Sequence, residues 1–323
     1  MRALIRTGTD KATLGLDVSH PEPTSADSPN SYIIKTKATA LTRGELTWPE
    51  PLTPAIPVPG FDFAGVVLAV PATLGAKAFQ PGDEVYGLTY PFSEKGNARD
   101  ITVADEREMS LKPKKLSWEE AAAIPLSALS AWQGLFTHGK LNGPRDGEKY
   151  GKRVLVTAAS GGVGIWAVQL AHRAGTNVVG TCGPSNVDFV KKLGADIVLD
   201  YSKNDLLRWV NEDWESRAFD VVMDCVGGQT LTDAWQCAKK GGIVISVAEP
   251  PNPRKPVGGV AEGVEGVWFI VEAKRDQLEE ITSLIEEGKC RGEVDRVYEL
   301  EQWEEAFERL EGGHARGKVV LRV

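Results

Sequence analysis

Cysteine and histidine are both scarce in this chain. Its 323 residues include four of each, with no Cys-x-x-Cys pair and no histidine beside a cysteine. A structural zinc needs about four closely grouped nitrogen or sulfur ligands, so no metal site is expected. Scattered thiols in a chain of this length indicate reduced, mostly buried cysteines rather than a disulfide framework. The cysteines are Cys182, Cys225, Cys237 and Cys290.

Long apolar runs and an excess of positive charge are also missing. No stretch approaches the ~18 apolar residues of a membrane span, so no membrane partner is expected. The formal net charge of −8 argues against nucleic acid or an anionic surface as a partner. The segment Met1–Gly8 lacks the apolar core of a signal peptide, and a cytoplasmic location is expected. The length suits about two domains.

The most informative segment that is present is Val154–Gly164, an apolar run that ends in a glycine-rich turn. The helical pattern of Ile165–Gly175 follows at once, which is the layout of a dinucleotide-binding βα unit. Glycines let the backbone approach a pyrophosphate, and the helix start directs its amide groups at that anion. Gly161-x-x-Gly164 is present, whereas Ala159 replaces the usual first glycine. A tight strand-to-helix connection without a ligand is the alternative.

The first part of the chain is rich in strands and loops. Apolar alternation and turn residues predict strands at Tyr32–Ala40, at Phe61–Val70 and directly after the turn at Gly82. The capping box from Ser117 to Glu120 predicts a helix start, and an apolar helix is expected over Ser127–Phe136.

From Lys152 onward strands and helices alternate, which implies a parallel sheet with right-handed crossovers. Gly175, Gly194 and Gly241 are interpreted as helix C-caps. The expected strands are Arg153–Thr157, Asn177–Thr181, Asp196–Leu199, Phe219–Asp224 and Ile243–Val247. The expected helices are Val163–Ala174, Val187–Leu193, Asn204–Asn211 and Leu231–Lys239.

The tail returns to the earlier character and is expected to pack on the N-terminal domain, which makes that domain discontinuous. The pattern predicts strands at Val267–Val271 and Gly317–Val323, and helices at Gln277–Glu287 and Gln302–Leu310. The proline-rich segment Glu249–Gly259 is expected to be an exposed loop or an edge that pairs with another subunit.

The residues after the second expected strand of this half bear on the choice of dinucleotide. In dinucleotide folds an acidic residue about 20 positions after the glycines binds the ribose 2′-hydroxyl. The segment Gly180–Asn186 has no carboxylate, and its absence favours NADP(H) over NAD(H). Ser185 and Asn186 offer hydrogen bonds to a phosphate, and Lys191 or Lys192 offers charge. The alternative is an ordinary turn with solvated lysines.

Five segments carry a resemblance: Pro59–Val67, Pro81–Gly87, Ala121–Trp132, Ala158–Gly164 and Ala315–Leu321. In this order and spacing the chain resembles the medium-chain dehydrogenases/reductases. More narrowly, it is similar to the zinc-independent quinone oxidoreductase-like branch, which includes zeta-crystallin and the fungal trans-acting enoyl reductases.

The resemblance implies an α/β fold in which a Rossmann domain with a doubly wound parallel sheet interrupts a GroES-like β-rich domain. It also implies an active cleft between the two domains. The expected division is 1–125 for the first part of the GroES-like catalytic domain, 126–264 for the Rossmann NADP-binding domain and 265–323 for the return segment. A homodimer is suggested by the resemblance alone.

The resemblance also implies positions for the site residues. The positions that hold catalytic zinc in metal-dependent relatives match Thr42, Phe61 and Ser127, and phenylalanine cannot ligate a metal. Many relatives carry a basic residue where this chain has Ser185, which weakens the expected grip on the 2′-phosphate. The implied cofactor contacts are Ser160, Gly161, Gly162 and Val163 for the pyrophosphate, Ser185, Asn186 and Tyr201 for the 2′-phosphate, Ser130, Cys225, Val247, Phe269 and Val271 near the nicotinamide, and Lys318.

The expected chemistry is hydride transfer from NADPH to a quinone or to the C=C bond of an α,β-unsaturated carbonyl. Conjugation spreads the developing charge onto an oxygen, which hydroxyl or N–H donors can stabilise without a metal. A simple alcohol or ketone develops a concentrated alkoxide, for which zinc relatives use their metal. The candidate donors are Thr42, Tyr90 and Ser127, with Arg43, Glu45 and Trp48 on the same segments.

Three alternatives stay open from the sequence. One is an alcohol or carbonyl oxidoreductase. Another is a reductase of a bulky, carrier-bound enone in a secondary-metabolite pathway, for which aromatic residues would form the pocket. The third is a non-catalytic NADPH-binding protein comparable to the lens crystallins. The aromatic residues in question are Trp48, Tyr90, Trp132 and Trp268.

Overall fold

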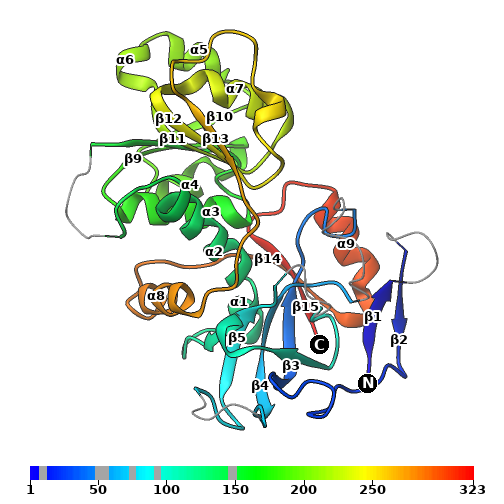
Figure 1. The fold of residues 1–323 in the computed structure, drawn as a ribbon. Coiled ribbons are helices and arrows are strands. Elements are labelled where there is room, and N and C mark those ends of the chain that lie inside the picture. Colours follow the sequence, from blue (N-terminus) through cyan, green and yellow to red (C-terminus); the bar gives the residue numbers. More distant parts are fainter. Residues whose placement is uncertain (7–12, 48–57, 73–77, 91–95, 145–150) are drawn as a thin grey trace. The chain divides into compact units, whose positions relative to one another are not determined.

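The computed structural model describes residues 1–6, 13–47, 58–72, 78–90, 96–144 and 151–323 (Figure 1). Its contacts divide the chain into two compact units. The first, here called the β-rich unit, consists of Met1–Leu129 and Glu272–Val323. The second, here called the Rossmann unit, is the continuous segment Ser130–Val271.

The Rossmann unit is built on a parallel sheet of six strands within the described residues, in the order β10-β9-β8-β11-β12-β13. The strands are β8 (Arg153–Val156), β9 (Asn177–Cys182), β10 (Ile197–Asp200), β11 (Phe219–Asp224), β12 (Ala238–Ser246) and β13 (Glu265–Trp268). From β8 the chain builds outward in both directions, so the topological switch point lies between β8 and β11.

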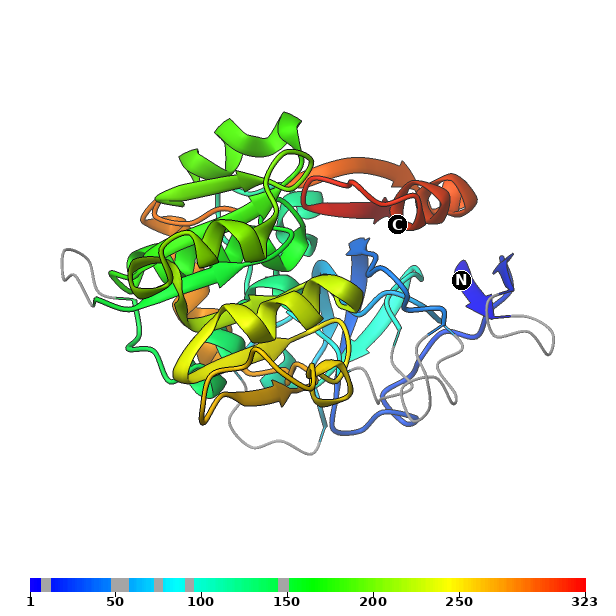
Figure 2. The same cartoon turned by 90° about the horizontal axis from the view of Figure 1, so that it is seen from above.

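Helices cover both faces of this sheet. Figure 1 shows α3 and α4 below the strands and α5, α6 and α7 above them, and Figure 2 looks down on the side that carries α5, α6 and α7. The helices are α3 (Gly162–Arg173), α4 (Val187–Lys192), α5 (Leu206–Asn211), α6 (Trp214–Arg217) and α7 (Gly228–Cys237). The strands are apolar and buried, with Leu155, Val179 and Val222 fully covered, as expected for parallel strands packed on two sides. The predicted doubly wound α/β fold is confirmed.

The β-rich unit takes strands from both ends of the chain. One sheet has the order β14-β15-β3-β4-β5-β7, with β6 paired to β3, and a separate pair joins β1 to β2. The red strand β15 lies beside the blue β3 in Figure 1, and the register of this pair sets Leu321 opposite Thr39. The strands are β1 (Ala3–Arg6), β2 (Leu14–Asp17), β3 (Tyr32–Ala40), β4 (Asp62–Ala69), β5 (Glu84–Leu88), β6 (Ile101–Ala104), β7 (Met109–Leu111), β14 (Val294–Glu299) and β15 (Lys318–Arg322).

The described part of the β-rich unit also contains the helices α1 (Trp118–Ala122), α8 (Arg275–Glu286) and α9 (Trp303–Glu311), and α2 (Pro125–Trp132) begins in it and ends in the Rossmann unit. The Ser117 hydroxyl accepts a hydrogen bond from the Glu120 amide, and the Glu120 carboxylate accepts one from the Ser117 amide. This confirms the capping box that the sequence predicts. Helix α2 begins at Pro125, and its helical path continues as a π-helix over Gln133–His138, which extends the predicted Ser127–Phe136 helix at both ends.

Three local predictions need correction or refinement. The strand predicted at Val267–Val271 is wrong at its end, because β13 pairs only with β12, and β12 ends at Ser246 opposite Trp268. Gly241 does not cap a helix, because α7 ends at Cys237 and Gly241 lies inside β12 with φ +70°. The segment Glu249–Gly259, predicted as a loop or a pairing edge, is a loop with a short 3-10 turn, and its pairing with another subunit stays a prediction.

Within the described residues, no helix has the length and apolar character that crossing a bilayer requires.

Candidate functional site

The glycine-rich turn of the Rossmann unit joins β8 to α3. The Gly161 amide donates a 2.8 Å hydrogen bond to the Ala158 carbonyl, and Ala158 has φ +46°. A Cβ at Gly164 would lie 2.1 Å from the Ala158 oxygen, so only glycine lets the helix approach the turn this closely. In the described structure no side chain caps α3, and its first turn has no acidic residue. Of the predicted pyrophosphate residues Ser160–Val163, Gly161 uses its amide within the turn, whereas Gly162 and Val163 form the helix start, where backbone amides fit an anion.

The residues predicted for the adenosine end of the cofactor lie after the neighbouring strands β9 and β10. Ser185 and Asn186 belong to a 3-10 turn directly after β9, and Tyr201 follows β10 with 55% of its surface exposed. The Tyr201 amide donates to the Cys182 carbonyl at 3.2 Å. A Cβ at Gly183 would lie 3.0 Å from the Tyr201 hydroxyl oxygen, so the phenol lies against this glycine.

The charged residues near Ser185, Asn186 and Tyr201 in the chain lie around the end of β10 and on α4. Strand β9 ends in Cys182 and carries no carboxylate there. Asp200 ends β10, but its Oδ1 accepts hydrogen bonds from the Ser202 amide (3.0 Å) and hydroxyl (2.7 Å). Lys203 lies 3.8 Å from Asp200 with its side chain 76% exposed. Lys203 is a cation that the sequence analysis missed, whereas the predicted Lys191 and Lys192 are exposed at the end of α4.

A buried polar network closes the switch point between β8 and β11. The Thr157 hydroxyl donates to Asp224 Oδ1 at 2.9 Å and accepts from the Cys225 amide at 2.8 Å. The Ser246 hydroxyl and the Gly227 amide both donate to Asp224 Oδ2 at 2.9 Å. Burial raises the pKa of the Asp224 carboxyl, and the hydrogen bonds from Ser246 and Thr157 oppose that shift. The network fixes the loop that carries Cys225.

The sequence analysis assigned no role to Thr157, Asp224 or Ser246. The available signal is that each of these polar residues ends, or directly follows, an apolar strand of the predicted parallel sheet. The carboxyl ends of such strands carry the ligand site in open α/β sheets.

The residues predicted near the nicotinamide are placed as follows. The Val247 amide donates to the Asp224 carbonyl at 3.0 Å, directly after β12. Burial raises the pKa of the Cys225 thiol, so it stays neutral rather than a nucleophilic thiolate. Phe269 packs its ring on His138 with centroids 4.4 Å apart. Ser130 is buried on α2, and Val271 is buried at the end of the Rossmann unit.

A second polar cluster lies in the β-rich unit. The Lys318 ammonium is 3.3 Å from Asp62 Oδ2 and donates to the Thr42 hydroxyl at 3.1 Å. The Leu126 amide donates to Asp62 Oδ1 at 2.6 Å, which ties the start of α2 to β4. Asp62 is fully buried and Lys318 is 5% exposed, whereas Thr42 is partly exposed. Burial raises the pKa of the Asp62 carboxyl, while the Lys318 charge opposes the shift.

Glu45 lies in the same buried region. Its two carboxylate oxygens accept hydrogen bonds from the Thr42 amide (3.3 Å) and the Gly60 amide (3.2 Å). Burial raises the pKa of Glu45 to about 7, against the opposing charges of Lys318 and Arg6. This carboxyl therefore titrates near neutral pH beside the lysine.

The other residues singled out by the sequence are more dispersed. Ser127 is 1% exposed on α2, one residue after Leu126. Tyr90 is partly exposed, and its amide donates to Glu108 Oε1 at 3.1 Å. Arg43 is exposed. Among the aromatic residues, Trp132 packs edge-on against Phe136, Trp268 is 42% exposed at the end of β13, and Trp48 lies outside the described residues.

The donor set does not fit zinc. Among the described residues no group of three or more His, Cys, Asp or Glu side chains is arranged to hold a metal ion. The positions matched with zinc ligands carry the hydroxyls of Thr42 and Ser127 and the hydrocarbon ring of Phe61, and the Lys318 ammonium contacts Thr42. Zinc prefers thiolate, imidazole and carboxylate ligands, and a neighbouring ammonium repels it. Zinc-independence nevertheless stays a prediction.

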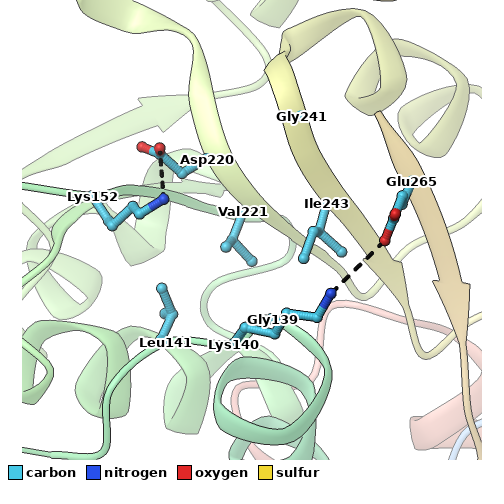
Figure 3. A pocket seen from close by; sticks show the side chains of 9 residues that line it. All are labelled: Gly139, Lys140, Leu141, Lys152, Asp220, Val221, Gly241, Ile243 and Glu265. Carbon is cyan, nitrogen blue, oxygen red and sulfur yellow. Dashed lines mark ion pairs between the residues drawn. The ribbon is translucent and has the colours of Figure 1, made fainter. Parts of the chain in front are cut away.

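A cavity of about 240 Å³ in the Rossmann unit lies elsewhere, at the amino ends of β8, β11, β12 and β13. Figure 3 shows its two lysines, each facing a carboxylate: Lys152 is 3.4 Å from Asp220, and Lys140 is 4.0 Å from Glu265. These pairs balance their charges. The candidate cofactor group lies at the opposite, carboxyl ends of the strands, which is where such sheets bind ligands.

Known proteins resemble this chain in sequence and in fold. Residues 193–321 match a family model described as zinc-binding dehydrogenase. A relative from Arthroderma benhamiae, described as a probable mitochondrial zinc-binding oxidoreductase, is 46% identical over 94% of this chain and 92% of its own length. The mouse protein described as mitochondrial NAD(P)H oxidoreductase RTN4IP1 is 36% identical over 82% of this chain and 70% of its own. The solved quinone oxidoreductase of Coxiella burnetii is 28% identical, with a TM-score of 0.84 over 100% of this chain and 99% of that one.

These names contradict the expected cytoplasmic location. Both relatives are described as mitochondrial, which points to an organelle. The prediction was wrong because it tested for the apolar core of a secretory signal. Organelle-targeting segments are amphipathic and rich in arginine and serine, so that test does not detect them.

Proposed function

This chain belongs to the zinc-binding dehydrogenase family of the medium-chain dehydrogenases/reductases, and we propose that it is an NADPH-dependent reductase of quinones or α,β-unsaturated carbonyls that works without zinc. The observation that carries the proposal is the start of α3 at Gly162, within the segment Ser160–Val163. There no side chain of the described residues accepts a hydrogen bond from the first amides of the helix. Backbone amides at that position bind the pyrophosphate of a dinucleotide. The name of the RTN4IP1 relative supports a nicotinamide cofactor.

The proposed preference for NADPH rests on the residues after β9 and β10, at the adenosine end of the cofactor. A carboxylate at the end of β9 would bind the ribose hydroxyls of NADH and repel a 2′-phosphate, and Cys182 stands there instead. Ser185, Asn186 and Tyr201 offer hydrogen bonds, and Lys203 offers a positive charge. In the proposed complex these four residues hold the 2′-phosphate.

When bound, NADPH supplies a hydride from C4 of its dihydronicotinamide. Such a hydride would bring two electrons and one proton to the acceptor. A proton from water completes the product, which is a hydroquinone from a quinone or a saturated carbonyl from an enone. The protein's part is to hold the acceptor and to donate hydrogen bonds to the oxygen on which negative charge develops.

A conjugated acceptor suits the polar groups that the β-rich unit offers. Its cluster provides a hydroxyl on Thr42 and a buried ammonium on Lys318. Such donors would stabilise the delocalised charge of an enolate or of a hydroquinone anion, whereas a localised alkoxide needs stronger Lewis-acid help. The quinone oxidoreductase among the structural relatives supports the same class of acceptor.

The test is NADPH oxidation, followed by absorbance, against a panel of benzoquinones, naphthoquinones, enals and enones, with saturated ketones and alcohols as controls. We expect turnover of at least one conjugated acceptor, a higher kcat/KM with NADPH than with NADH, and no loss of activity after treatment with a zinc chelator. If NADPH binds saturably but no acceptor of the panel is turned over, the non-catalytic alternative is favoured. Reduction of ketones alone, or loss of activity on zinc removal, would contradict the proposal. The suggested homodimer stays a prediction.

A further inference from the structure

Asp62, Lys318 and Thr42 form a line of contacts from the interior of the β-rich unit toward its surface. Asp62 is fully buried, Lys318 is 5% exposed, and Thr42 is partly exposed. The Lys318 ammonium is 3.3 Å from Asp62 and donates to the Thr42 hydroxyl oxygen at 3.1 Å. A hydroxyl has two acceptor lone pairs and one hydrogen. Because Lys318 occupies a lone pair, the Thr42 hydrogen stays available for another acceptor.

We propose that Lys318 is a positioning residue that makes the Thr42 hydroxyl the hydrogen-bond donor to the substrate oxygen, and that Asp62 holds Lys318 in place. This inference rests on the proposed reductase function and deepens it, because it names the donor and the source of its charge. It also gives Lys318 a role on the side of the acceptor rather than on the cofactor alone.

The charge arrangement explains why the ammonium stays where it is. A buried lysine is stable only with a partner, and Asp62 is that partner. Asp62 Oδ1 is committed to the Leu126 amide at 2.6 Å. Its Oδ2 makes no geometrically good hydrogen bond to any described residue and lies nearest the ammonium. The Lys318 ammonium is therefore held between Asp62 Oδ2 and the Thr42 hydroxyl.

The same arrangement strengthens Thr42 as a donor. A hydroxyl that accepts a hydrogen bond from a cation is polarised and becomes a better donor, and the effect is larger in a low-dielectric interior. The Glu45 carboxyl nearby accepts hydrogen bonds from the Thr42 and Gly60 amides, which hold the backbone of Thr42 in place. A fixed ammonium thus supplies positive charge at one of the positions matched with zinc ligands.

Thr42 is favoured over the other two candidate donors for specific reasons. Ser127 is 1% exposed and so is covered within its own unit. Tyr90 is partly exposed and is held by its backbone amide, which donates to Glu108 Oε1, whereas Lys318 donates to the Thr42 hydroxyl itself. Thr42 combines partial exposure with a direct contact to a buried charge.

The test compares variants of the full-length protein in the NADPH-oxidation assay. T42V removes the donor, T42S keeps it, and T47V is the matched control on the same turn, where Thr47 donates to the Gly44 carbonyl. D62N/K318M removes both buried charges together, so that neither is left unpaired. K112M is its control, because Lys112 is another buried lysine of the unit, 3.2 Å from Glu84.

We expect T42V to lower kcat about 100-fold, as removal of one oxyanion donor does, with the NADPH dissociation constant unchanged. T42S should restore most of the activity, and T47V and K112M should keep it. D62N/K318M should lower kcat by a similar factor, and adding T42V to it should cause little further loss, because residues that act as one unit are non-additive. Full activity in T42V, or multiplied losses in the triple variant, would overturn the inference.

A second measurement is independent of turnover. The ¹⁵Nζ signal of Lys318, assigned by its disappearance in D62N/K318M, should shift in T42V and stay in place in T47V. An unchanged signal in T42V overturns the inference even if every acceptor fails. A protein that binds NADPH, shows the shift and reduces no acceptor would instead refute the proposed reductase function.

Discussion

Thr157 and Asp224 join the carboxyl ends of two adjacent strands through a 2.9 Å hydrogen bond. Thr157 directly follows β8 and Asp224 ends β11, so the bond spans the switch point of the sheet. The same hydroxyl accepts from the Cys225 amide. The strand that leads into the glycine-rich turn is thereby coupled to the loop after β11.

This coupling can be tested with T157V. The substitution leaves a buried acceptor and a buried amide each short of one partner, which costs about 1–3 kcal/mol. We expect lower stability in denaturant unfolding and severalfold weaker NADPH binding by fluorescence titration. T176V is the control, because Thr176 donates a buried hydrogen bond to the Ala171 carbonyl at the other end of the unit. Equal NADPH affinity in T157V and T176V would argue against the coupling.

The close approach of α3 to its turn predicts a strong effect of G164A. The added Cβ would lie 2.1 Å from the Ala158 oxygen and 2.8 Å from the Ala159 Cα, so the helix start must move away from the turn. We expect NADPH binding to weaken by at least about tenfold, which is 1.4 kcal/mol. G143A is the control, because a Cβ there meets nothing within 4 Å. Unchanged titration curves for G164A would show that the amides of this turn do not bind the cofactor.

The proposed contact of Ser185 with the adenosine 2′-phosphate predicts a change of cofactor preference in S185D. A carboxylate after β9 repels a 2′-phosphate and accepts hydrogen bonds from ribose hydroxyls. We expect kcat/KM for NADPH to fall about tenfold or more, equal to 1.4 kcal/mol, and kcat/KM for NADH to rise. S283D places the same charge on the exposed face of α8 and should change neither value. A preference for NADPH that survives in S185D would remove Ser185 from the phosphate site.

Glu45 predicts a specific pH dependence of stability. Burial raises its pKa from 4.5 to about 7, and Lys318 and Arg6 oppose the shift. The folded protein therefore keeps a proton that the unfolded chain releases, and the resulting stability is fully present below about pH 4.5 and lost as the pH rises through 7. We expect E45Q to lack this loss. Relative to wild type it should gain about 3 kcal/mol between about pH 4.5 and pH 8.5.

Denaturant unfolding across that pH range measures the effect. E215Q, an exposed change on α6, is the control and should follow the wild-type curve. Parallel curves for E45Q and wild type would show that Glu45 does not titrate in this window.

Features with a short sequence range were predictable. The capping box at Ser117 and Glu120 and the turn Ala158–Gly164 depend on residues a few positions apart, and so do the helix C-caps at Gly175 and Gly194. Their geometry follows from local backbone preferences and glycine's freedom at positive φ. The alternation of strands and helices after Lys152 then implied the parallel sheet.

Strand ends were less predictable, because a strand extends only as far as a neighbouring strand offers backbone hydrogen-bond partners. Phe269–Val271 has the composition of a strand, yet β12 offers no partner beyond Ser246. Conversely, β14 is poorly marked in the sequence and forms because β15 lies beside it over Arg296–Glu299. Pairing across the sheet overrode local preference in both places.

The sequence alone therefore determined the α/β class, the dinucleotide-type turn and the family, because these depend on local pattern and on motifs in a set order. The tertiary structure decided which polar groups meet. Lys318 and Thr42 are 276 positions apart. Nothing in the sequence around Asp62, the first residue of β4, distinguishes it from other acidic residues at strand starts. Pairing of the C-terminal strand β15 with β3 brings the lysine to both partners. A contact between distant segments depends on the whole packed unit, which no local pattern encodes.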